Sequence, residues 1–74
     1  MAGEKSAFDI DRVFTYHAPK NDQPERYGQL RGRAQDMAKM IEEFCPPSRE
    51  RSLALTNLQQ TVMWANAAIA INEE

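Results

Sequence analysis

The chain has 74 residues, a mass of 8.5 kDa and a net charge of −2 at pH 7, from nine basic and eleven acidic side chains. This length allows one small domain, residues 1–74, and a chain this short buries only about 60% of its unfolded surface. With a single cysteine and a single histidine, neither an intramolecular disulfide nor a zinc-type ligand set is expected to support the core. We therefore expect association with further copies of the chain.

The charge and hydropathy pattern also limits the partners. A negative chain lacks the positive field that duplex nucleic acid requires, so no duplex partner is expected. Residues 1–11 are polar and do not resemble a signal peptide. Residues 52–72 are uncharged, but eight of them are Ser, Thr, Asn or Gln, a density that a lipid-facing helix would not carry. We expect a soluble intracellular protein with no membrane partner.

The first predicted element is a short helix over residues 8–16. Apolar side chains in this segment could line one side of a helix, and acidic residues lie near its start, where the helix dipole favours them. It is followed by a turn at Ala18–Asp22.

A long helix is predicted over residues 23–44. Asp22 is placed as N-cap, Pro24 lies in the first turn, and Glu25 stands three residues after Asp22, as in a capping box. An apolar stripe with alternating spacings of three and four then runs to the end of the segment: Tyr27, Leu30, Ala34, Met37, Ile41 and Phe44. Pro46 stops this helix.

A second long helix is predicted over residues 49–71, with Ser48 as N-cap. Its apolar residues form two neighbouring stripes, so it is apolar on a wide arc, which is typical of helices buried on more than one side. The prediction is an all-α chain: a short N-terminal helix and an antiparallel pair of long helices, assembled into a helical homo-oligomer. The alternative is a monomer in which the N-terminal segment covers the remaining face.

The sequence predicts a protein that is not an enzyme and needs no cofactor or metal. It contains no Gly-rich phosphate loop, nucleophile elbow, metalloprotease motif or paired-cysteine spacing. Glu42 and Glu43 are adjacent, so on a helix they point about 100° apart and do not face each other.

Positive charge is concentrated in residues 20–39, which suits a small anionic ligand or an ordinary solvated helix face. Gly28 and Gly32 share one helix face with Arg31 and Gln35. This facet could admit a flat ligand or the backbone of a second helix. Arg33 projects to another flank, so Arg31 and Arg33 of one chain are not expected to hold the same ligand.

Aromatic residues and the histidine supply the other candidates. Tyr16 can stack on a base and His17 can donate to a phosphate, although by residue type Tyr16 is more often a half-buried cap on a core. Trp64 lies among small and apolar neighbours and is interpreted as a core or interface residue.

Five segments form a recognisable series: Phe14–Pro19, Gln23–Tyr27, Pro47–Glu50, Ala54–Thr56 and Val62–Ala70. In order and spacing they resemble the small phage anti-CBASS family of cyclic-oligonucleotide sponges. The resemblance covers residues 8–72, and the Met-Trp-Ala-Asn-Ala-Ala-Ile-Ala run is its most distinctive part.

The resemblance implies a homohexamer in the cytoplasm of the infected bacterial host. Such proteins hold cyclic dinucleotides and trinucleotides in separate interchain pockets without cleaving them. It implies that Tyr16 stacks on a base and that Arg31 meets the phosphates, with Arg33 as a candidate for the trinucleotide pocket. The alternatives are a helical adaptor that binds a host protein through residues 52–72, and a helix-turn-helix DNA-binding module. The uncharged third helix argues against the DNA-binding module.

Overall fold

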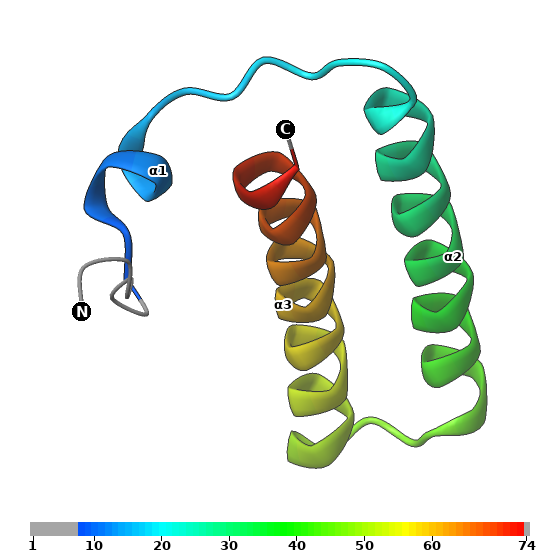
Figure 1. Cartoon of the computed structure of the whole chain (residues 1–74). Helices are drawn as coiled ribbons and strands as arrows, with labels where there is room; N and C mark the ends of the chain where they lie inside the picture. Colours follow the sequence, from blue (N-terminus) through cyan, green and yellow to red (C-terminus); the bar gives the residue numbers. More distant parts are fainter. Residues whose placement is uncertain (1–7, 74) are drawn as a thin grey trace.

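The computed structural model describes residues 8–73. It contains α1 (Ile10–Phe14), α2 (Gln23–Phe44) and α3 (Arg49–Asn72), and the described part of the chain has no strand. The all-α prediction is therefore confirmed, with one short and two long helices. Figure 1 shows α2 and α3 side by side and antiparallel, joined by the short turn after Phe44. The predicted domain also includes residues 1–7 and 74, which lie outside the described residues.

Helix α2 begins at the predicted position but without the predicted capping box. Asp22 is the N-cap residue, yet its side chain makes no capping hydrogen bond. Its carboxylate instead lies 3.1 Å from the Arg26 guanidinium, one turn further along. The helix ends at Phe44 because Cys45 adopts an extended backbone before the two prolines.

The turn between the long helices is held by Ser48 and Arg51. Ser48 Oγ accepts a hydrogen bond from the Arg51 amide at 3.0 Å, which confirms Ser48 as the N-cap of α3. The Arg51 guanidinium donates to the carbonyl oxygens of Glu42 and Cys45, at 3.4 and 3.2 Å. One arginine of α3 thus satisfies carbonyls that the end of α2 leaves without helical partners.

Helix α1 is shorter than the predicted 8–16 because both of its ends are closed locally. Asp9 caps the start, with its carboxylate accepting from the Arg12 amide at 3.2 Å. Thr15 leaves the helix with an extended backbone, while its hydroxyl donates to the Asp11 carbonyl. Figure 1 shows α1 beside the C-terminal end of α3, joined to α2 by a long connection. Large apolar side chains of α3 remain exposed, so residues 8–73 do not cover the outer face of α3 as the monomer alternative requires.

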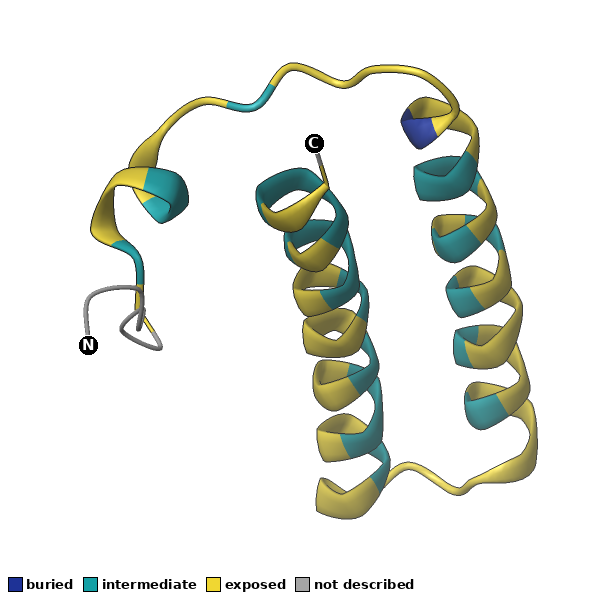
Figure 2. Cartoon of the chain, in the orientation of Figure 1, coloured by how far each residue is buried: buried dark blue, intermediate teal, exposed yellow. Residues whose placement is uncertain are grey.

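The hairpin encloses very little. Half-buried residues follow the facing sides of α2 and α3, and the outer sides are exposed (Figure 2). Among residues 8–73 no apolar side chain is buried, and Gln23 is the one buried residue. The Cα radius of gyration is 16.2 Å, against about 11 Å for a compact domain of this length.

Large apolar side chains are exposed on all three helices. Trp64 is 74% exposed, Met63 60% and Phe44 70%. Within one chain, therefore, the interpretation of Trp64 as a core residue is wrong, because most of its side chain is open to solvent. Its role at an interface stays a prediction.

Candidate functional site

The predicted Gly/Arg facet lines a groove between the long helices. Gly28, Arg31, Gly32 and Gln35 of α2 face Leu55, Leu58, Gln59 and Val62 of α3 across a hollow of about 460 Å³, which also borders Ala34 and Ala38. We call this the glycine groove. A Cβ added at Gly28 would lie 3.8 Å from Arg31 Nη2, and one at Gly32 would meet nothing within 4 Å. No contact within the described chain requires these glycines, so the space beside them is open to something else.

A second hollow lies further along the same pair of helices. It has a volume of about 330 Å³ and is lined by Tyr27 and Arg31 of α2 and by Asn66, Ala67 and Ala70 of α3. We call this the asparagine groove. Arg31 lines both hollows, so its guanidinium can reach an anion in either one.

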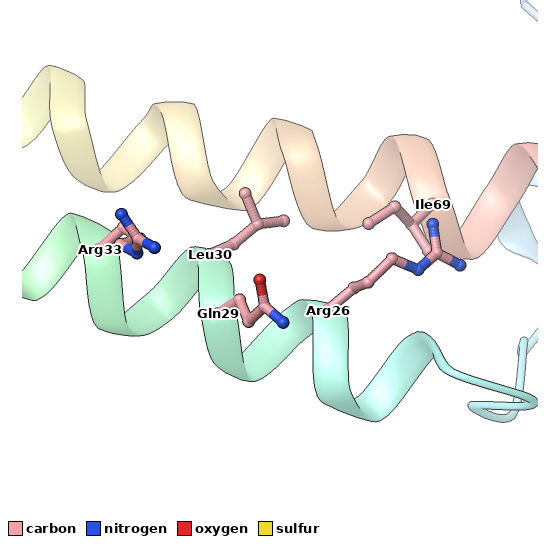
Figure 3. Close-up of a pocket in the computed structure, with 5 residues that line it drawn as sticks. All are labelled: Arg26, Gln29, Leu30, Arg33 and Ile69. Atoms are coloured by element: carbon pink, nitrogen blue, oxygen red, sulfur yellow. The ribbon is translucent and has the colours of Figure 1, made fainter.

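A third hollow, the arginine groove, is shown in Figure 3. It has a volume of about 370 Å³ and is lined by Arg26, Gln29, Leu30 and Arg33 of α2 and by Ile69 of α3. Arg33 therefore lines a different hollow from Arg31. This agrees with the expectation that the two arginines of one chain do not hold the same ligand.

The arginine groove adjoins a polar clasp that closes the open end of the hairpin. Both terminal nitrogens of Arg26 donate to the Glu73 carboxylate, at 2.7 and 2.6 Å. The Gln23 amide donates to the same carboxylate at 2.9 Å. These hydrogen bonds, from Arg26 first and Gln23 second, lower the pKa of Glu73 to about 2. The pKa of Arg26 is raised above its ordinary value, mainly by its hydrogen bond to Glu73.

The clasp distinguishes the two arginines of this groove. Arg26 shares its charge with Glu73 and Asp22, so it is largely neutralised. Arg33 is exposed and has no ion pair within residues 8–73. An anion that entered the arginine groove would thus meet Arg33 as its main positive charge.

Tyr16 and His17 lie outside all three hollows. Tyr16 is 83% exposed, so the interpretation as a half-buried cap is wrong for a single chain. His17 is half-buried, and its Nε2 lies 2.7 Å from the Arg12 carbonyl oxygen, to which it can donate. Only its other ring nitrogen is then left for a further partner.

The described part of the chain offers no group of three or more His, Cys, Asp or Glu side chains that could hold a metal ion. None of the described helices is long and apolar enough to cross a membrane.

Comparison with known families identifies the hairpin. The family described as Acb2/Tad1, hairpin domain, matches residues 9–70. The chain belongs to this family, which is the anti-CBASS sponge family. Acb2/Tad1 proteins form a binding family that is not known as enzymatic. No curated protein and no solved structure matches the chain.

Tyr27, Gln59 and Asn66 line the grooves and were not among the predicted site residues. Tyr27 was assigned to the apolar stripe, and Asn66 lies on a largely apolar helix. A polar residue on such a helix marks a candidate site residue. Whether it lines a groove depends on the register of α3 against α2, which residue spacing along one helix does not give.

Proposed function

We propose that this chain sequesters cyclic dinucleotide and cyclic trinucleotide second messengers, such as cyclic GMP-AMP, without cleaving them. As a phage protein in the cytoplasm of an infected bacterium, it would keep the messenger from activating CBASS effectors. The observation that carries this proposal is the Acb2/Tad1 match, which extends over residues 9–70.

The proposed site combines residues that one chain keeps apart. Tyr16 stacks on a base and Arg31 meets a phosphate. His17 donates to a phosphate through its second ring nitrogen when the ring carries both protons, since Nε2 already donates to the Arg12 carbonyl. Tyr16 lines none of the hollows that Arg31 lines. We infer that Tyr16 and His17 of one copy complete a groove that contains Arg31 of another copy.

Assembly follows from the same exposed surfaces. No apolar side chain within residues 8–73 is buried in one copy, whereas a stable fold of this size needs more burial than that. We propose a homohexamer, in which α3 buries its outer apolar face and neighbouring copies enclose the ligand. Two copies related by a twofold axis would present Tyr16 and Arg31 twice, which matches a cyclic dinucleotide with two bases and two phosphates.

The arginine groove is proposed as the separate site for cyclic trinucleotides. Arg33 lines the arginine groove, so it can serve a ligand other than the one that Arg31 holds. This separation is the structural support for assigning Arg33 to the trinucleotide.

Calorimetric titration tests the proposal. Cyclic GMP-AMP and cyclic tri-AMP are titrated into the full chain and into Tyr16→Ala and Arg31→Ala variants. Lys39→Ala serves as the control, because Lys39 is an exposed cation of α2 that lines none of the three hollows. We expect the Tyr16 and Arg31 variants to bind cyclic GMP-AMP at least about tenfold more weakly, since one stacked base contributes about 1–3 kcal/mol.

The fate of the ligand is read in the same samples. After denaturation of the protein, chromatography should recover the cyclic nucleotide intact, because a sponge releases what it bound. Absence of binding to any cyclic dinucleotide or trinucleotide would refute the sponge function, and recovery of linear products would refute the absence of cleavage.

The exposure of Trp64 and Met63 supports a second candidate, a helical adaptor that binds a host protein through α3. Native mass spectrometry separates the two. A chain that stays monomeric and binds no cyclic nucleotide favours the adaptor.

A further inference from the structure

Asn66 occupies the asparagine groove beside Arg31. It comes from α3 and faces Tyr27 and Arg31 of α2, while Ala67 and Ala70 contribute only small side chains to the same hollow. The hollow therefore combines one neutral amide, one positive charge and one tyrosine ring, with little other bulk on the α3 side. Its volume of about 330 Å³ is near the lower end of the range usual for ligand pockets.

The amide of Asn66 is not held by the chain itself. Asn66 Oδ1 is shielded from solvent and has no hydrogen-bond partner, and no hydrogen bond of this side chain occurs within residues 8–73. Asn72 on the same helix contrasts with it, because its Nδ2 donates to the Ala68 carbonyl at 3.2 Å. Buried polar atoms in folded proteins are almost always paired. Turning the Asn66 amide breaks no hydrogen bond, so either end can be presented to the groove.

We propose that Asn66 recognises the edge of an adenine base, a role that rests on the proposed binding of cyclic nucleotides. An asparagine amide carries one acceptor and a donor group side by side. Adenine presents the complementary pair, an exocyclic amine next to a ring nitrogen that accepts. Guanine presents two acceptors at the corresponding edge, which one amide satisfies only in part. Arg31 in the same groove is then available for the phosphate.

A pair of ligands isolates this contact. Cyclic di-AMP and cyclic di-IMP differ at the six position of the purine, where the amine of adenine is replaced by a carbonyl. Asn66→Ala removes the amide, and alanine is a better helix former than asparagine, so α3 is expected to fold. Asn57→Ala is the matched control, because Asn57 is an exposed residue of α3 that lines none of the three hollows.

Titration calorimetry should give the following pattern. The unmodified chain binds cyclic di-AMP about tenfold more tightly than cyclic di-IMP, which corresponds to about 1.4 kcal/mol. Asn66→Ala loses this tenfold preference and binds cyclic di-IMP within about twofold of the unmodified chain. Asn57→Ala keeps the preference.

Two results would overturn the role of Asn66 and leave the sponge function intact: unchanged selectivity in Asn66→Ala, or an equal loss for both ligands. Native mass spectrometry of the variants tests whether the amide pairs with a neighbouring copy of the chain rather than with a base. A smaller particle for Asn66→Ala, with selectivity retained, would show that the amide pairs with a neighbouring copy instead. If the unmodified chain binds neither these ligands nor cyclic GMP-AMP, the proposed function fails together with this inference.

Discussion

Replacing Trp64 with alanine should weaken self-association strongly. Trp64 is 74% exposed in one chain, and a tryptophan side chain can bury up to about 250 Å². Roughly 185 Å² is thus open to water, equivalent to about 4–5 kcal/mol per copy at about 25 cal/mol per Å². Binding costs reduce this upper bound, and truncation of a central aromatic at an interface costs about 2–4 kcal/mol. We expect association to weaken by about 30- to 1,000-fold.

Sedimentation velocity over a dilution series measures this effect. Trp64 is the only tryptophan of the chain, so interference optics are preferable to absorbance for comparing the two proteins. Gln60→Ala is the control, since Gln60 is also exposed on α3 and lines none of the three hollows. Circular dichroism at a concentration at which both variants are assembled should show the same helix content. If Trp64→Ala associates as tightly as Gln60→Ala, Trp64 does not lie in an interface and the reasoning from its exposure is wrong.

Three further predictions concern the grooves and the clasp. Arg31→Ala should weaken cyclic dinucleotide binding by about tenfold or more in calorimetry, whereas Arg33→Ala should leave this binding within about twofold. The reason is that the two arginines line different hollows. Equal losses in the two variants would contradict this separation. Gly32→Ala should raise the thermal midpoint, since the added Cβ meets nothing within 4 Å and alanine favours a helix by about 1 kcal/mol; a lower midpoint would mean that another chain packs there. The pKa of Glu73 is lowered from 4.5 to about 2, so the contribution of this carboxylate to folding is present above pH 4.5 and is lost as the pH falls toward 2. The difference in unfolding free energy between the unmodified chain and Glu73→Gln should therefore shrink over that range. A constant difference would contradict the clasp.

Much of the hairpin could be predicted because its signals are local. Apolar spacing and the prolines placed the two long helices, and Ser48 was recognised as an N-cap from its position after two prolines. These features depend on residues within a turn or two of one another, where spacing along the chain determines geometry.

The contacts that sequence reasoning missed join distant residues. Arg26 and Glu73 are 47 positions apart, and no local pattern marks them as partners. The ion pair between Arg26 and Asp22 also explains the failed capping box, since Arg26 holds the carboxylate that was expected to cap α2. The exposure of Tyr16 was missed for a related reason: an aromatic residue tends to be buried, but Tyr16 lies after the end of α1, where its side chain is 83% exposed.

The glycine facet shows how far the candidate site could be predicted. Helical spacing placed Gly28, Arg31, Gly32 and Gln35 together, and all four line one groove. Spacing within α2 could not show which residues of α3 face them. Nor does a single chain bring Tyr16 to Arg31, so the complete site depends on the proposed assembly.

Native mass spectrometry of the full chain, with and without cyclic GMP-AMP, tests the central claim most directly. The account predicts a hexamer whose mass increases by whole numbers of intact ligand, because the grooves are completed between copies. A monomer whose mass is unchanged in excess cyclic GMP-AMP would contradict both the assembly and the sponge function.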